Sequence, residues 1–375
     1  MSSARSHSTI YNLARREWFL GVSAATCLVF LLVGKGLAAR LESPVHLPLV
    51  LTVLFVVVLG SALNVVRHAE HLAKQLGEPY GTLILTLAVT VIEVTSISGV
   101  MLHGDHNPTM PRDTLLAVVM IILNGMVGMS LLIGGWRYRE QQHNLQGASI
   151  YLGAVIPLVV LSLVLPNFTQ TTKGPTLSFA QQVFLIVVSV GLYVTFLLVQ
   201  TGRHSNYFSI GEEQGVHRRK ESMPRRAIAA STICLVAYLV PALYLAERLA
   251  HPIDYVVETL QAPTAVGGVI VAALVATPEA IGAMRAACSN QLQRSINIFL
   301  GSVLSTIGLT VPAMVLISEL AGQQIILGVQ HAELVLLILT LIVSIVTFSS
   351  GRTNVFQGLV HLVLFAAYMM LIFQG

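Results

Sequence analysis

Two acidic side chains stand inside long apolar stretches of this chain, where charged groups are rare. Glu93 lies near the middle of the segment GTLILTLAVTVIEVTSISG, and Glu279 lies near the middle of GGVIVAALVATPEAIGAMR. A carboxylate at the centre of a bilayer costs at least about 2.5–3.5 kcal/mol, and such residues usually mark the path of an ion or a proton. The pattern therefore predicts a site where carboxylate oxygens take up cations or protons. A protonated, purely structural role is the alternative for each glutamate.

The surroundings of the two glutamates resemble each other. The sequence VTVIE at 89–93 matches VATPE at 275–279. Each is followed by an apolar segment with glycine and small polar residues, LNGMVG at 123–128 and LGSVLS at 300–305. Matched segments of this kind predict an internal repeat, and the two copies of such a repeat often share one ion site near the middle of the membrane.

Oxygen-bearing side chains near the glutamates are predicted to complete the site. Pro278 removes a backbone hydrogen bond and frees a carbonyl just before Glu279. Carboxylate, hydroxyl, amide and carbonyl oxygens are the hard ligands that Ca²⁺ prefers. We therefore expect a cation to be held by Glu93, Glu279, Thr90, Thr277, Ser302, Ser305 and Asn124, with Thr306 as a further oxygen donor. Close packing of helices is the alternative role for the small polar residues.

Membrane-spanning helices must position these residues. Hydrophobic residues make up 55% of the 375 residues and charged residues only 10%, whereas soluble domains carry about 25% charged residues. A helix needs about 20 apolar residues to cross a bilayer. This rule predicts eleven spans, of which the eighth is expected to be broken by Pro278. They are expected at 18–39, 47–66, 80–102, 114–135, 148–166, 177–200, 227–249, 265–286, 296–319, 330–348 and 354–374.

The basic residues predict the orientation of these spans. With a cytoplasmic N-terminus, the 21 Lys and Arg residues divide into sixteen on the inside and five on the outside, which are Lys35, Arg40, Arg112, Lys173 and Arg248. Short cytoplasmic loops carry such an excess of basic residues. The net charge of +4 therefore reflects membrane orientation, and no nucleic-acid partner is expected. The C-terminus is expected on the periplasmic side.

The two glutamates lie on the third and the eighth predicted span, and this odd offset of five means that the two copies run in opposite directions. The predicted fold is an all-α integral membrane protein with two inverted five-helix repeats and one extra N-terminal helix. The expected parts are an N-terminal tail and first helix at 1–46, a first repeat at 47–200, a cytoplasmic loop at 201–226 and a second repeat at 227–375.

The string GEPYGTLILT at 77–86, running on to Glu93, resembles the first signature of the cation/proton exchangers in the calcium–cation antiporter superfamily. The likeness is strongest to bacterial calcium/sodium–proton antiporters of the ChaA type. The string ATPEA at 276–280 and LGS at 300–302 resemble the second signature. The resemblance implies that Glu93 and Glu279 are the exchange-site acids, and that Ca²⁺, Na⁺ or K⁺ leaves the cell as protons enter.

One departure from the pattern bears on ion preference. Related exchangers often carry a Gly-Ser-x-x-Ser-Asn type of run in both copies. The second copy here keeps Gly301, Ser302 and Ser305, whereas the corresponding part of the first copy, at 123–129, lacks the hydroxyls. The number of ligands, and with it a preference for Ca²⁺ over Na⁺, is therefore left open.

The sequence predicts a secondary transporter in the bacterial inner membrane rather than an enzyme. Metal and protons would compete for the two glutamates, because metal binding needs the deprotonated carboxylate. No cofactor is expected, and no GxxxxGK[ST] or HExxH motif occurs. The partners are inorganic cations, protons and the lipid bilayer, with homo-oligomer formation left open. The alternatives are a Na⁺-driven Ca²⁺ exchanger without proton coupling and a cation channel of the same topology.

Two smaller features carry secondary hypotheses. His68 and His71 share a helix face by their spacing, and the pair is expected either to lie at the membrane interface or to sense pH or bind a metal. The Glu212–Glu213 pair lies in the basic 201–226 loop. That loop is expected to be a solvated linker attracted to anionic lipid, with cation sensing by the glutamates as the alternative.

Overall fold

The computed structural model describes residues 16–38, 43, 45–77, 80–103, 107–202, 204–209 and 225–374, and almost all of them are helical. Most of the predicted 201–226 loop lies outside the described residues, with Glu212 and Glu213 in that part; so do Glu78 and Pro79 of the first signature string. The helices before the loop are α2 (Trp18–Ala38), α3 (His46–Leu76), α4 (Tyr80–Met101), α5 (Met110–Met120), η1 (Ile121–Met126), α6 (Val127–Tyr138), α7 (Leu145–Val159), η2 (Val160–Val164), η3 (Leu165–Asn167), α8 (Phe179–Thr201) and η4 (Ser205–Phe208). After it come α9 (Arg225–Asp254), η6 (Tyr255–Thr259), α10 (Thr264–Cys288), α11 (Leu292–Ser305), η7 (Thr306–Thr310), α12 (Val311–Leu320), α13 (His331–Phe348) and α14 (Val355–Gln374).

Within the described residues, ten helical segments are long and apolar enough to cross a bilayer, and the shorter apolar stretch Trp18–Gly34 of α2 precedes them. Each of the eleven predicted spans overlaps one of these helices, which confirms the all-α membrane fold. The second span differs most, because α3 runs on to Leu76 instead of ending near residue 66. The extra turns carry polar residues, so an apolar pattern alone could not extend the helix.

The same order of elements occurs twice along the chain. A long helix (α3, α9) is followed by the helix that carries a membrane glutamate (α4, α10). The next helix contains a short π-helical segment, as α5–η1–α6 in the first half and α11–η7–α12 in the second. Two more helices complete each half. The predicted limits 47–200 and 227–375 for the two repeats remain predictions.

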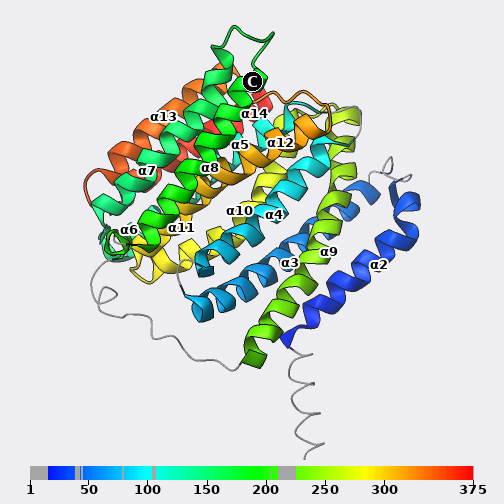
Figure 1. The fold of residues 1–375 in the computed structure, drawn as a ribbon, viewed down its shortest axis with the longest axis horizontal. Coiled ribbons are helices and arrows are strands. Elements are labelled where there is room, and N and C mark those ends of the chain that lie inside the picture. Colours follow the sequence, from blue (N-terminus) through cyan, green and yellow to red (C-terminus); the bar gives the residue numbers. More distant parts are fainter. Residues whose placement is uncertain are drawn as a thin grey trace, which may run out of the picture.

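The helices with the two glutamates lie between two groups (Figure 1). On one flank α2, α3 and α9 lie together, and α3 packs along α9. Helices α4 and α10 occupy the middle, where α4 contacts α3 and α9, and α10 contacts α5 and α11. The remaining helices, α5 to α8 and α11 to α14, form the other side. Helices α4 and α10 are thus enclosed between the two groups.

The predicted break at Pro278 is wrong. Helix α10 continues through this residue from Thr264 to Cys288. Proline is tolerated inside a membrane helix because neighbouring helices and hydroxyl side chains compensate for the lost backbone bond. The carbonyl that loses its backbone partner at Pro278 is that of Leu274, while the Thr277 hydroxyl donates to the neighbouring Ala273 carbonyl at 2.5 Å.

A small antiparallel ribbon, which the sequence did not predict, joins two interhelical connections. Strand β1 (Glu140–Gln142) follows α6, and β2 (Arg352–Asn354) precedes α14. Gln141 pairs with Thr353 at the centre of the ribbon, and both are buried. The ribbon therefore holds the α6–α7 connection against the α13–α14 connection, one from each half of the chain.

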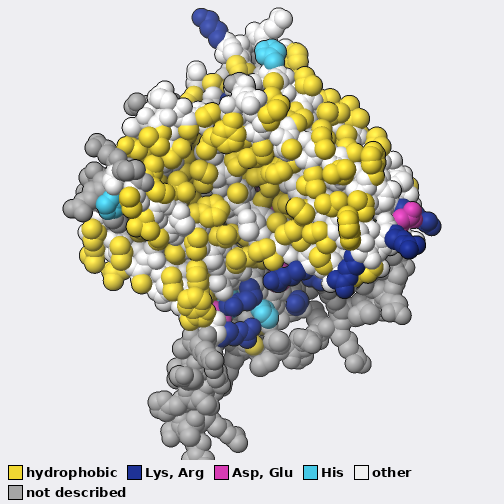
Figure 2. Space-filling view, turned by 180° about the vertical axis from the view of Figure 1, so that it is seen from behind, with side chains coloured by type: hydrophobic (Ala, Val, Ile, Leu, Met, Phe, Trp, Pro, Cys, Tyr) yellow, Lys and Arg dark blue, Asp and Glu magenta, His cyan; other side chains and the backbone are white. Residues whose placement is uncertain are grey.

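The surface agrees with a membrane location. Apolar side chains cover the middle of the face shown in Figure 2, and most Lys and Arg side chains visible there gather along one border. Many large apolar side chains on the outer helices are exposed, for example Leu32 at 75% and Val346 at 63%. In water such a surface would aggregate, whereas a bilayer accommodates it. The chain is therefore a multi-pass membrane protein.

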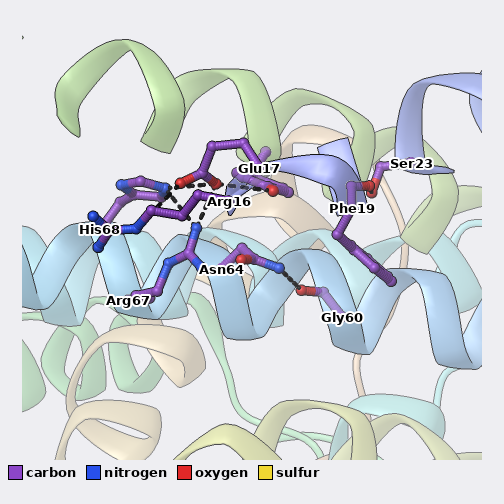
Figure 3. A network of polar contacts seen from close by, with 9 residues as sticks. Arg16, Glu17, Phe19, Ser23, Gly60, Asn64, Arg67 and His68 are labelled. Atoms are coloured by element: carbon purple, nitrogen blue, oxygen red, sulfur yellow. Dashed lines mark hydrogen bonds and ion pairs between the residues drawn. The ribbon is translucent and has the colours of Figure 1, made fainter. Parts of the chain in front are cut away.

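The extra helix α2 is fastened to α3 and α9 by a buried carboxylate that precedes it (Figure 3). Glu17 forms an ion pair with Arg67 and lies 3.3 Å from His68 Nε2. Tyr238 of α9 donates its hydroxyl to the same oxygen of Glu17 at 3.1 Å. Farther along α2, the hydroxyls of Ser23 and Ser61 are 2.8 Å apart. These contacts tie α2 to both long helices of the flank.

Candidate functional site

Glu93 is enclosed in the middle of the molecule. It lies on α4 with 2% of its surface exposed. Its Oε2 atom accepts hydrogen bonds from the hydroxyls of Thr306 at 3.2 Å and Thr310 at 2.8 Å. The other oxygen, Oε1, is buried without a hydrogen-bond partner among the described residues. One half of this carboxylate is therefore held by hydroxyls, and the other half is free to accept a proton or contact a cation.

Glu279 faces the same segment from α10. Its Oε2 atom accepts a hydrogen bond from the hydroxyl of Ser302. The residue is more open than Glu93 and is half-buried rather than buried. The charge of Glu93 acts on Glu279, and both side chains bond the same helical stretch, Ser302 to Thr310. The structure thus brings together the two acids that are 186 positions apart in the sequence.

A single stretch of helix supplies the hydroxyls for both carboxylates. Ser302, Thr306 and Thr310 recur at every fourth residue along α11 and η7, and this spacing keeps side chains on one face of a helix. Ser302 contacts Glu279, whereas the two threonines contact Glu93. Thr306 and Thr310 begin and end the π-helical segment η7. Such segments are uncommon and often lie at functional sites.

This arrangement has the chemistry of a site for hard cations. Two carboxylates and three hydroxyls present only oxygen ligands, which suit Ca²⁺ and other hard cations rather than soft metals. A group of three or more His, Cys, Asp or Glu residues does not occur in the described part of the chain. Any cation at Glu93 and Glu279 would therefore be held by two acids plus neutral oxygens. Protonation of those acids would remove the charge that attracts it.

Three predicted hydroxyl ligands, Thr277, Ser305 and Thr90, lie on the helices of the site but, in the part of the chain that the structure describes, bond groups other than Glu93 and Glu279 or have no bond to them. Thr277 bonds within its own helix, as described above, and Ser305 donates to the Ser302 carbonyl at 2.9 Å. Thr90 is buried, at 8% exposure, one turn before Glu93 on α4. Within the described residues, no hydrogen bond links these three hydroxyls to Glu93 or Glu279. Their role as ligands remains a prediction.

Asn124 lies in η1, the π-helical segment of the first half, and belongs to a separate buried network. Its side-chain nitrogen donates to the Thr340 hydroxyl at 2.8 Å. Its side-chain oxygen lies 3.2 Å from Nδ1 of His361, whose Nε2 is 3.0 Å from the Thr347 hydroxyl. This network joins α13 and α14 to η1. Coordination of a cation by Asn124 would require the network to rearrange, and its ligand role stays a prediction.

Thr310 is the residue at this site that the sequence analysis missed. The signal was present, because Thr310 follows Thr306 by four residues and Ser302 by eight. Thr86, which shares a sequence stripe with Thr90 and Glu93, hydrogen-bonds with Tyr193 of α8. The stripe therefore does not act as a single ligand set. Its hydroxyls are divided between helix packing and the surroundings of Glu93.

Comparisons with known proteins give a consistent result. The model of the sodium/calcium exchanger protein family matches residues 46–202 and again 230–374. The protein y4hA of Sinorhizobium fredii is 43% identical over 313 residues, which cover 83% of this chain and 85% of y4hA. The sodium-potassium/proton antiporter ChaA of Escherichia coli is 38% identical over 356 residues, covering 93% of this chain and 96% of that protein. The solved structure of native YfkE shares the fold, with a TM-score of 0.70, 20% identity and coverage of 95% and 100%.

Proposed function

This chain belongs to the sodium/calcium exchanger protein family, and we propose that it exchanges a metal cation for protons across the membrane. The exchange uses one site built on Glu93 and Glu279. The observation that carries the proposal is the pairing of two membrane carboxylates, one from each half of the chain, on the hydroxyl face of α11 and η7. The proton as the counter-ion is supported by the name of the ChaA relative.

Coupling follows from competition for the same oxygens. A cation binds when the carboxylates are ionised, and protons displace it when they bind instead. One Ca²⁺ or two protons neutralise both negative charges, whereas one Na⁺ or K⁺ neutralises both only if the second carboxylate keeps a proton, so that no charge is left uncompensated within the membrane. The site opens to one side of the membrane with the cation and to the other side with protons. A change in the relative position of the two halves of the chain switches the access.

The cargo is a hard cation from the set Ca²⁺, Na⁺ and K⁺. The ChaA relative is named for sodium and potassium, and a relative from Bacillus subtilis that is 24% identical is named for calcium. Three hydroxyls, all from the second half, accompany the two carboxylates. With one oxygen from each group, the shell has fewer than the six to eight oxygens usual for Ca²⁺. Water or backbone carbonyls, such as the one freed by Pro278, complete the shell.

The location and orientation complete the proposal. The protein lies in the inner membrane of a bacterium, with its N-terminus in the cytoplasm and its C-terminus in the periplasm. The sixteen-to-five division of basic residues supports this orientation. Two alternatives do not couple the cation to protons: Na⁺-driven Ca²⁺ exchange and a cation channel of the same topology. Only proton exchange links the cation gradient to a change of pH.

Flux measurements in inverted vesicles test the proposal. We expect added Ca²⁺, Na⁺ or K⁺ to collapse a preformed pH gradient, and Glu93→Gln and Glu279→Gln to abolish this response. Both changes keep the shape of the side chain and remove its charge. Glu319→Gln is the matched control, since Glu319 is exposed at the end of α12. Proton-coupled flux at the normal rate in both glutamine variants would refute the site, and ohmic cation current would favour a channel.

A further inference from the structure

A pair of histidines lies at the ends of α4 and α9, apart from the two glutamates. His103 follows the last residue of α4 by two positions, and His251 lies in the last turn of α9. Nε2 of His103 and Nδ1 of His251 form a hydrogen bond of 3.0 Å, in which one ring donates and the other accepts, and the two ring centroids are 3.8 Å apart. A metal ion shared by both nitrogens would replace the proton of this bond. Both side chains are half-buried, so the pair is accessible to small solutes. The exchange mechanism uses neither residue.

The geometry suits two ligands of one metal ion. Metal–nitrogen bonds to histidine are about 2.0–2.1 Å long, so nitrogens 3.0 Å apart subtend about 90° at a shared ion. This is the angle between neighbouring ligands in octahedral or square-planar coordination, which Ni²⁺ and Cu²⁺ adopt. A tetrahedral ion such as Zn²⁺ needs the nitrogens about 3.4 Å apart, which small rotations of the rings provide.

The backbone around the pair is held firmly. One turn before His103, Gly99 packs against Glu247 of α9, and a Cβ atom at Gly99 would lie 3.3 Å from the Glu247 Cα. This close approach fixes the distance between the two helices. His251 lies on α9, and His103 follows the end of α4 by two residues. The packing of the two helices therefore brings together side chains that are 148 positions apart.

Charged groups of both signs lie near the pair. Burial, His103 and Arg248 oppose a positive charge at His251, while Glu247 attracts it. The Arg248 guanidinium lies over the ring of Tyr244, 5.0 Å from its centroid. Among the described residues, His103 and His251 are the two ligands that the proposed site offers. Water fills the other positions around the ion.

We propose that His103 and His251 bind one divalent transition-metal ion of the first row and thereby bridge α4 to α9. Imidazole nitrogens are favoured ligands of Ni²⁺, Cu²⁺ and Zn²⁺, whereas Ca²⁺ and Na⁺ prefer oxygen. The site is therefore distinct from the cargo site in both position and chemistry. Because α4 also carries Glu93, the bound metal restrains a helix that exchange requires to move, and it slows cation/proton flux.

Calorimetric titration of the purified full-length protein with NiCl₂ and with ZnCl₂ tests the proposal, using an affinity tag without histidines. We expect one site in the micromolar range for the unmodified protein. His103→Gln and His251→Gln should each weaken it at least tenfold, and the double variant, which keeps neither nitrogen ligand, should weaken it further. His331→Gln, which changes an exposed histidine at the start of α13, is the matched control and should bind normally. Affinity should fall as the pH decreases from 8 to 5.5, because only neutral histidine binds metal.

Two further measurements separate this site from the cargo site. The Glu279→Gln protein should keep the Ni²⁺ site although it loses exchange, so the two proposals can fail independently. Electron paramagnetic resonance of bound Cu²⁺ should show two nitrogen ligands in the unmodified protein and one in either single variant. Unchanged titrations in both histidine variants, or a loss confined to one of them, would overturn the proposal. Inhibition of flux by Ni²⁺ should disappear in His103→Gln.

Discussion

Replacing Thr310 with valine gives a quantitative test of how the proposed exchange site is tuned. Valine matches threonine in shape but lacks the hydroxyl that donates to Glu93 at 2.8 Å. That bond stabilises the ionised carboxylate, which can only accept hydrogen bonds. Its loss makes protons better competitors against the cation. The pH profile of exchange should therefore move towards alkaline pH.

The size of the shift follows from the strength of the lost bond. A hydrogen bond to a charged group contributes about 1.5–3 kcal/mol, which corresponds to about 1–2 pH units. The Thr306 hydroxyl remains, at 3.2 Å from the same oxygen, and it compensates in part. We therefore expect a shift of about one pH unit, and a rise of about tenfold in the apparent KM for the cation at a pH below the transition.

Cation-dependent proton flux is recorded in vesicles between pH 6 and pH 9 for the unmodified protein and the variant. Thr310→Ser keeps the donor and should retain the original profile. Thr195→Val is the matched control, because Thr195 is exposed on α8 and bonds only the Gly191 carbonyl of its own helix. An unchanged midpoint in Thr310→Val, or a shift towards acid pH, would show that the hydroxyl does not tune Glu93.

Two further predictions concern stability in detergent, measured as Tm. Gly358→Ala should destabilise the α6–α14 contact by about 1–3 kcal/mol, because the new Cβ would lie 2.5 Å from the Leu132 nitrogen and 2.8 Å from the Gly128 carbonyl. Gly191→Ala, which meets nothing within 4 Å, should leave Tm unchanged, and equal effects would refute this explanation. Glu17→Gln should cost about 1–3 kcal/mol at pH 7. Burial alone would raise the pKa of Glu17, but the His68 hydrogen bond, the Arg67 charge and the Tyr238 hydrogen bond hold that pKa below its ordinary value of 4.5. The stabilisation is therefore complete above pH 4.5 and lost as pH falls through the lower folded pKa, so the gap in Tm between the two proteins should close in acid; a gap that persists would refute the ion pair as its cause.

The membrane helices could be predicted from sequence because lipid imposes a simple rule. Every backbone group must be paired within the span, so an apolar run of sufficient length becomes a helix. The rule fails where helices leave the lipid, and α3 continues ten residues beyond the predicted end at residue 66. The rule also cannot predict the ribbon of β1 and β2, because the pairing of Gln141 with Thr353 depends on how the two halves of the chain pack.

The sequence predicted the two acidic residues of the candidate site, but it did not predict which hydroxyls bond them. The cost of placing a carboxylate in the middle of an apolar run singles out Glu93 and Glu279, whereas Asp113 and Asp254, which are also buried, lie near helix ends. Hydroxyls carry no such cost, because a threonine can bond a carbonyl of its own helix, as Thr277 does. Their partners depend on the rotation of each helix and on π-helical segments, and the sequence pattern shows neither. The spacing of Ser302, Thr306 and Thr310 places the three hydroxyls on one helix face, but it does not show that this face meets Glu93 and Glu279.

The distribution of hydroxyls makes the two halves of the proposed site unequal. Ser302, Thr306 and Thr310 all belong to the second half, while the π-helical segment of the first half holds Asn124 in a network with α13 and α14. Helix α11 with η7 therefore contacts both carboxylates. A movement of α4 relative to this helix would break the bonds of Glu93 while those of Glu279 persist. Glu93 is the more enclosed acid and depends on two donors, so its proton exchange should respond to the conformational change, whereas the half-buried Glu279 should remain the first contact for an entering cation.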